Sequence, residues 1–152
     1  KTETLGLLDD THRELRLVAH NLMPEQLLTN GLSSALSDFA HSVPNARFHH
    51  FGSERRLPRD IEVVLYRCAY ELVNNSLKHA CATKIDIQLV QEADKVMLTV
   101  CDDGCGIDGT RLPASDGIGL RNIRERISHY KGLLDILTNE GGGSEINVTL
   151  PL

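Results

Sequence analysis

The stretch PRDIEVVLYRCAYELVNNSLKHA, residues 58–80, decides the fold because it carries the most regular helical pattern of the chain. Proline suits the first turn of a helix, where the N–H group that it lacks would have no intrahelical partner. Apolar side chains then recur at helical spacing along one face, at Ile61, Val64, Leu65, Cys68 and Leu72. This pattern predicts one long amphipathic helix over residues 58–80.

Four predicted strands follow this helix as two consecutive pairs. Alternation of apolar and polar side chains predicts a first pair of strands over residues 83–90 and 95–101, and a second pair over residues 133–138 and 144–150. The polar turn 92–94 joins the first pair, and three glycines at 141–143 separate the second. A glycine-bearing loop over 102–119 and a helix to about residue 130 lie between the two pairs. Strands this close in the chain can pair as hairpins.

Two helical patterns and a weaker strand pattern precede the long helix. Residues 8–23 carry apolar side chains at helical spacing, and Pro24 ends that helix because proline removes a backbone donor. A second helical pattern covers 24–43, with a predicted bend at Asn30-Gly31, and residues 46–51 alternate weakly as a strand would. The order of elements predicts an α+β two-layer sandwich with an N-terminal helix, rather than an alternating doubly wound fold.

The composition excludes several classes of protein. A chain of 152 residues has room for one domain and a short appendage. The net charge of −5 lacks the basic footprint of a nucleic-acid-binding protein, so no direct nucleic-acid partner is expected. No apolar run approaches the roughly 20 residues that span a bilayer, so we expect no membrane contact by this segment. The four cysteines form no CxxC pair, which favours free thiols in a reducing cytoplasm.

The C-terminal half of the long helix carries a polar stripe beside its apolar face. At about 100° per residue, Glu71, Asn75 and Lys78 share one side of the helix. A carboxylate and an amide oxygen four residues apart can bind a hard divalent cation, and a lysine one turn further on can meet phosphate. Consecutive asparagines also cost about half a kcal/mol each in helix propensity relative to alanine. The stripe indicates a cleft wall, but an exposed polar face explains it equally well.

Two glycine-bearing segments suit a bound ligand. In VCDDGCGI, residues 100–107, Asp102 stands at a strand end and can accept a hydrogen bond from an exocyclic amine, while alternating glycines permit close approach. An ordinary Asp-Gly turn is equally consistent with this segment. In DGIGL, residues 116–120, glycines lead into a helix whose free N–H groups suit phosphate. It is no Walker A loop, since no Gly-Lys-Ser/Thr follows, and alone it is a weak signal.

The final strand begins with a hydroxyl group after a glycine turn. In GGGSEINVTLPL, residues 141–152, Ser144 could donate to a carboxylate or to a nearby water. Taken alone, the glycines are better explained as an ordinary hairpin turn. This segment indicates a ligand site only when it is considered together with the other three.

Taken in order, ELVNNSLKHA, DDGCGI, DGIGL and GGGSEINVTLPL resemble the N box, the two glycine boxes and the closing motif of the histidine-kinase branch of the GHKL ATPases. That superfamily also contains DNA gyrase, a heat-shock chaperone family and the MutL mismatch-repair proteins. The resemblance covers about residues 58–152. It implies the GHKL (Bergerat) two-layer sandwich with a mixed, mostly antiparallel sheet, and it implies Mg-ATP as the ligand.

The resemblance assigns the polar stripe to the metal and the phosphates. Asn75 would coordinate the Mg²⁺ that bridges the ATP phosphates. Glu71 and Asn75 would be the catalytic residues, and Glu71 would hold a water or help to position that metal. Lys78 would contact phosphate, and His79 would lie near the sugar or the phosphates.

The same resemblance assigns the glycine segments to the base and the lid. Asp102 would bond the adenine amino group, and Ser144, where many relatives have threonine, would support Asp102 from the last strand. Glycines would shape the pocket at the base and at the phosphates, namely Gly104, Gly106, Gly117 and Gly119. Residues 108–116 would form the ATP lid, which is short here and lacks a phenylalanine-bearing motif, as in the branch typified by the nitrate sensors.

The N-terminal stretch resembles the second helix of that branch's dimerisation hairpin. We therefore expect residues 1–24 to end that hairpin and residues 25–152 to form the ATP-binding catalytic domain. The helix with the phosphorylated histidine is expected upstream, so the chain alone would not phosphorylate itself. His20 lacks a neighbouring acid to take its proton. The implied partners are the dimerisation domain, a second copy in the full-length homodimer and a response regulator, all in the cytoplasm.

Two other functions share the nucleotide motifs. A GHKL serine kinase of the anti-sigma type would carry every one of them, but the N-terminal helix pattern favours a histidine kinase. A non-catalytic nucleotide-binding module is also conceivable. Against it, Glu71, Asn75, Lys78 and Asp102 are all present, whereas a decayed site would be expected to lose at least one.

Overall fold

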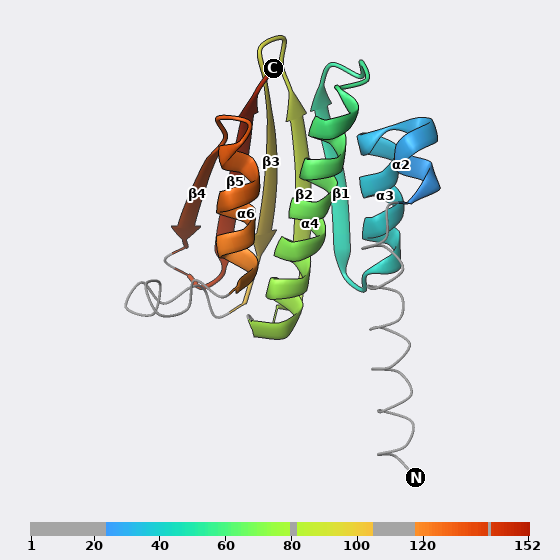
Figure 1. The fold of residues 1–152 in the computed structure, drawn as a ribbon. Helices are drawn as coiled ribbons and strands as arrows, with labels where there is room; N and C mark the ends of the chain where they lie inside the picture. The colour runs from blue at the N-terminus through green and yellow to red at the C-terminus, as the bar shows by residue number, and fades with distance from the viewer. Residues whose placement is uncertain (1–23, 80–81, 105–117, 140) are drawn as a thin grey trace.

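The computed structural model describes residues 24–79, 82–104, 118–139 and 141–152, which form a two-layer α+β sandwich (Figure 1). The predicted helix over 8–23 and most of the glycine loop lie outside the described residues. The described elements are α2 Glu25–Asn30, α3 Leu32–Ser42, β1 Ala46–Gly52, α4 Arg59–His79, β2 Ile85–Gln91, β3 Lys95–Asp102, α6 Ile118–Ser128, β4 Leu133–Thr138 and β5 Ser144–Pro151.

The five strands form one mixed sheet in the order β1-β2-β3-β5-β4. The β2–β3 and β4–β5 pairs are antiparallel hairpins, and β3 also pairs with β5 in antiparallel fashion. Among the described strands, only β1 and β2 are parallel, and α4 is the crossover between them. The prediction of a mixed, mostly antiparallel sheet packed on helices is therefore confirmed.

Between residue 24 and α4, the predicted helices and strand are present. The pattern over 24–43 divides into α2 and α3 at Gly31, whose φ of 94° suits glycine. Pro24 stands in an extended conformation as the residue before α2. The weak strand pattern over 46–51 forms β1, which pairs along its whole length with β2.

The core lies between the sheet and the helices. Residues of β2 alternate between buried and partly exposed positions, so that Ile85, Ile87 and Leu89 turn toward the helices. Leu65 and Leu72 of α4 are completely buried against this face. Full burial of one such side chain contributes about 1.5–3 kcal/mol. This apolar contact fixes α4 over the sheet and so decides where its polar stripe lies.

An ion pair between the half-exposed Arg56 and the buried Glu62 connects α2 to α4. Glu62, in the first turn of α4, is only 2% exposed. Its carboxylate accepts hydrogen bonds from Arg56 Nε at 2.9 Å and from the Leu57 N–H at 3.0 Å. The same guanidinium donates to carbonyl oxygens at the end of α2, including that of Thr29 at 3.2 Å.

Among the described helices, none combines the length and apolar character that a membrane crossing needs.

Candidate functional site

Four elements meet at one end of the sheet, the lower end in Figure 1. There β3 ends at Asp102, β5 begins at Ser144, α4 reaches its last turns and α6 begins. Asp102 and Ser144 are cross-strand partners in the β3–β5 register. The elements that carry the predicted motifs therefore converge, although the motifs are far apart in sequence.

Asp102 is the centre of this site. Its side chain is 7% exposed, and its Oδ2 accepts hydrogen bonds from the hydroxyl groups of Ser76 and Ser144, each at 2.8 Å. Its Oδ1 accepts one from the Gly104 N–H at 3.0 Å. The predicted contact from Ser144 is thus present. A carboxylate can accept about four hydrogen bonds, so these three donors orient Asp102 and leave capacity for another donor.

Ser76 was missed by the sequence reasoning. It lies four residues after Leu72 and so continues the apolar stripe of α4, not the polar one. Ser76 is 5% exposed, and a buried hydroxyl without a partner would be costly. Helical spacing assigns Ser76 to the core, and a serine there requires a polar partner on the facing sheet. This was the signal in the sequence that could have identified it.

The turn before β5 requires glycine for a reason that the hairpin interpretation does not supply. Gly143 has a φ of 94°, and a β-carbon there would overlap the carbonyl oxygen of Asp102. Gly142, with a φ of 95°, lies against the carbonyl of Gly104, which a β-carbon would approach to 3.2 Å. The turn therefore packs directly on the backbone that follows Asp102.

Asp103 has a different role from its neighbour. It is exposed, and its carboxylate accepts hydrogen bonds from the N–H groups of Thr83 and Lys84, both at 2.8 Å, and from the Thr83 hydroxyl. These hydrogen bonds lower the pKa of Asp103 below its ordinary value. Asp103 thus ties the end of β3 to the chain that leads into β2, and Asp102 remains turned inward.

The polar stripe of α4 faces the first turn of α6. A β-carbon on Gly119 would overlap the carboxylate of Glu71 and lie 3.3 Å from Asn75 Nδ2. The absence of a side chain at Gly119 therefore lets the two helices approach at Glu71 and Asn75. Lys78 is exposed one turn further along α4. His79 is the last residue of α4, but its side chain, Gly106 and Gly117 lie outside the described residues.

Glu71 and Asn75 suit a magnesium ion that is shared with phosphates. Mg²⁺ takes oxygen ligands, and nucleotide sites usually supply one or two from the protein and the others from phosphate and water. Within the described residues, no three His, Cys, Asp or Glu side chains gather as a metal site. The pair beside the start of α6 therefore fits a nucleotide-bound magnesium ion better than a metal held by protein alone.

Comparison with known proteins gives one consistent family. Residues 60–152 match the family described as histidine kinase-, DNA gyrase B-, and HSP90-like ATPase. The sensor histidine kinase MctS of Rhizobium johnstonii is 32% identical over 142 residues, 89% of this chain and 31% of that protein. The sensor histidine kinase ComP of Bacillus subtilis is 32% identical over 151 residues, 95% of this chain and 20% of that protein.

A solved structure shows the same fold. The histidine kinase domain of the blue-light-activated kinase from Erythrobacter litoralis superposes with a TM-score of 0.62 at 22% identity, covering 81% of this chain and 60% of that one. The chain spans less than a third of the length of either of the two sequence relatives, at 31% and 20%.

Proposed function

Because the chain belongs to the histidine kinase-, DNA gyrase B- and HSP90-like ATPases, we propose that it is the catalytic domain of a sensor histidine kinase and transfers the γ-phosphoryl group of ATP to a histidine. The observation that carries the site assignment is the Asp102 carboxylate, buried, held by two serine hydroxyls and by a backbone N–H, with capacity for another donor. The adenine amino group is that donor. This arrangement selects adenine because a base with an oxygen at the same position would oppose one acceptor to another.

The phosphates extend from the adenine site toward the start of α6. Glu71 and Asn75 would hold the magnesium ion, which neutralises charge on the phosphates when bound. Free N–H groups in the first turn of α6 favour anionic oxygens, and exposed Lys78 supplies a positive charge at the other border. Gly106, Gly117 and His79 are assigned to the nucleotide from the resemblance alone.

The domain then acts by position and charge more than by covalent chemistry. It holds ATP with the γ-phosphate outward, so that a histidine nitrogen on a separate helical hairpin can attack while ADP leaves. We assign that hairpin, of which residues 1–24 form the end, to the full-length protein, which works as a homodimer and passes the phosphoryl group to a response regulator in the cytoplasm. The similarity to the sensor histidine kinases MctS and ComP supports this assignment.

Calorimetric titration tests the metal part of the site. A non-hydrolysable ATP analogue is titrated with and without Mg²⁺ into the wild type and into Asn75→Ala. We expect Mg²⁺ to strengthen binding by the wild type and to have little effect on the variant. Asn74→Ala is the matched control, because the neighbouring amide lies on the next position around α4 and should keep the full Mg²⁺ effect. Equal Mg²⁺ effects in Asn75→Ala and the wild type would overturn the metal assignment.

A phosphotransfer assay tests the activity. The chain is mixed with labelled ATP and with the dimerisation hairpin taken from its full-length protein. A label on the hairpin that survives base and is lost in acid identifies phosphohistidine and supports the proposal. An acid-stable label on serine would instead identify the anti-sigma type of kinase, and an unlabelled hairpin with intact nucleotide binding would favour a non-catalytic module.

A further inference from the structure

The strand β4 lies at one border of the sheet that the structure describes. It is last in the strand order and pairs with β5 in a register without interruption from Leu133 to Thr138. No other described strand pairs with its outer side.

The backbone of β4 offers hydrogen-bonding groups at this border. The N–H of Asn139 donates to the carbonyl of Gly143, which continues the β4–β5 register by one pair. In an antiparallel pair, alternate residues direct their backbone groups to the same neighbour. Odd-numbered residues of β4 therefore bond to β5, and Leu134 and Ile136 direct their N–H and C=O groups outward. Such a row of groups is a template for an added strand.

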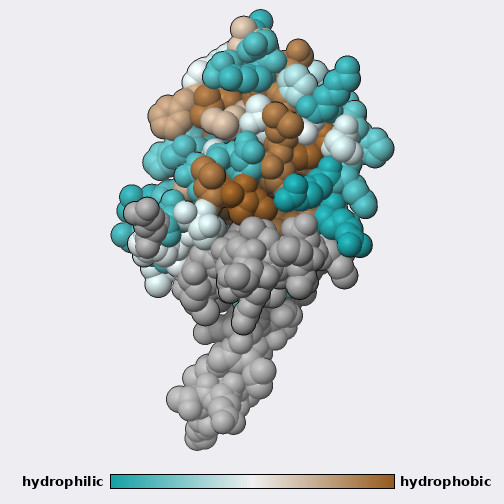
Figure 2. All heavy atoms as spheres, turned by 90° about the vertical axis from the view of Figure 1, so that its left-hand side faces the viewer, coloured by the Kyte–Doolittle hydropathy of each residue, from teal (hydrophilic) through white to brown (hydrophobic). Residues whose placement is uncertain are grey.

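Exposed apolar side chains flank this template. Leu133 is 65% exposed and Leu137 is 52% exposed, and both stand on the sheet face that turns away from the helices. Figure 2 looks onto this side of the molecule and shows hydrophobic side chains gathered in its middle, between hydrophilic regions. These two exposed leucines on one short border strand offer apolar surface that a partner could cover.

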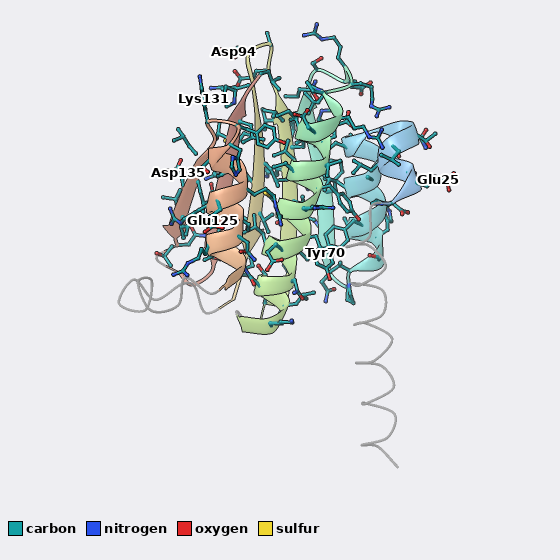
Figure 3. All side chains as sticks on the ribbon, in the orientation of Figure 1. Glu25, Tyr70, Asp94, Glu125, Lys131 and Asp135 are labelled. Atoms are coloured by element: carbon teal, nitrogen blue, oxygen red, sulfur yellow. The ribbon has the colours of Figure 1, made fainter. Side chains whose placement is uncertain are left out.

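The charge at the centre of the strand decides which partner fits. Asp135 lies between the two leucines on the same face, exposed at one border of the molecule (Figure 3). Glu145, the cross-strand neighbour of Leu137, adds a second carboxylate to this face. A second copy paired in antiparallel fashion about Asp135 would match Leu133 with Leu137, but it would place Asp135 opposite Asp135. Like charges directly opposite each other destabilise a strand pair. The border therefore disfavours its own copy and favours a basic partner.

We propose that β4 docks an extended segment of a partner protein, which joins the sheet as a sixth strand and sets a lysine or arginine against Asp135 and apolar side chains against Leu133 and Leu137. The partner is thus recognised by the pattern apolar-x-basic-x-apolar. This docking surface lies on the outer face and border of the sheet, apart from Asp102, and does not depend on the proposed kinase activity.

Nuclear magnetic resonance with synthetic peptides tests the proposal on the full chain. The probe is the capped peptide TTVTKTVTT, which presents lysine between two valines on one face, and its matched control is TTVTETVTT. We expect the lysine peptide to shift the amide signals of Leu134 and Ile136 and to bind about fivefold or more tightly than the glutamate peptide, since opposite and like charge pairs differ by about 1–2 kcal/mol.

A charge exchange makes the test specific. In Asp135→Lys, which changes an exposed side chain and should leave the thermal midpoint unchanged, the preference should reverse in favour of the glutamate peptide. Affinity for the ATP analogue should not change in this variant. Equal binding of the two peptides, shifts confined to other elements, or self-association of the chain through β4 in sedimentation would each overturn the proposal.

Discussion

Two buried carboxylates stand near opposite ends of α4, and their partners differ. Glu62 is 2% exposed and accepts from a guanidinium and a backbone N–H, so its charge is balanced inside the protein. Asp102 is 7% exposed, and the three donors that the structure describes for it are all uncharged. The first arrangement holds helices together. The second leaves acceptor capacity for a further donor at the end of the sheet where α4 ends and α6 begins, as a ligand requires.

The largest effect on stability is expected at Glu62. In Glu62→Ala, Arg56 loses its acceptor and the Leu57 N–H is left buried without one, so the free energy of unfolding should fall by about 2–4 kcal/mol. Urea unfolding measures this loss. Glu54→Ala, an exposed neighbour, is the control and should unfold like the wild type. Nucleotide affinity of the folded Glu62 variant should be unchanged, and a large loss of affinity there would remove the distinction between the two carboxylates.

The reverse pattern is expected at Asp102. Asp102→Ala removes a hydrogen bond to a charged acceptor, worth about 1.5–3 kcal/mol, so affinity for ADP should fall roughly 10- to 100-fold. Stability should also fall, because the buried Ser76 and Ser144 hydroxyls lose their acceptor, but by less than in the Glu62 variant, where a charged guanidinium loses its partner. Calorimetry and urea unfolding measure the two quantities. Asp94→Ala, in the exposed turn before β3, should alter neither of them.

A smaller effect is expected from each serine that orients Asp102. Ser76→Ala and Ser144→Ala should each weaken ADP binding by about two- to tenfold, since one neutral hydrogen bond contributes about 0.5–1.5 kcal/mol. Both hydroxyls donate to the same Oδ2 atom, so the double variant should lose less than the product of the two single effects. Strictly multiplicative losses would show that the two serines act independently of each other, against a shared role at Oδ2.

The sequence predicted most of this architecture because most of it is local. Periodicity fixes α4 and both hairpins, since each depends on neighbouring residues. The parallel pairing of β1 with β2 depends on chain segments separated by the whole of α4, and no local pattern specifies it.

Part of the site was likewise predicted from the sequence, and part of it depends on the fold. Asp102 and Ser144 belong to motifs, and their contact is present. Ser76 stands on the apolar stripe, and its importance depends on which atom of the facing sheet lies opposite. The need for glycine at position 143 likewise arises from the approach of the turn to the Asp102 backbone, which no sequence spacing reveals.

The smallest effect is expected at Asp103 and concerns pH. Hydrogen bonds lower the pKa of this carboxyl in the folded protein, so its contribution to stability is full above the unfolded pKa and is lost as the pH falls through the folded pKa. The wild type should therefore exceed Asp103→Asn in thermal midpoint at neutral pH, and the difference should narrow in acid. A difference that is constant with pH would mean that the charge of Asp103 does not matter.

The central claim is that Asp102 accepts a hydrogen bond from the adenine amino group, and base preference tests it most directly. Affinities for ADP and inosine diphosphate, which carries an oxygen in place of that amino group, are measured in the wild type and in Asp102→Asn. We expect the wild type to prefer ADP by about tenfold or more and the variant to lose most of this preference, because a carboxamide can donate to the oxygen. An equal preference in both proteins would contradict it.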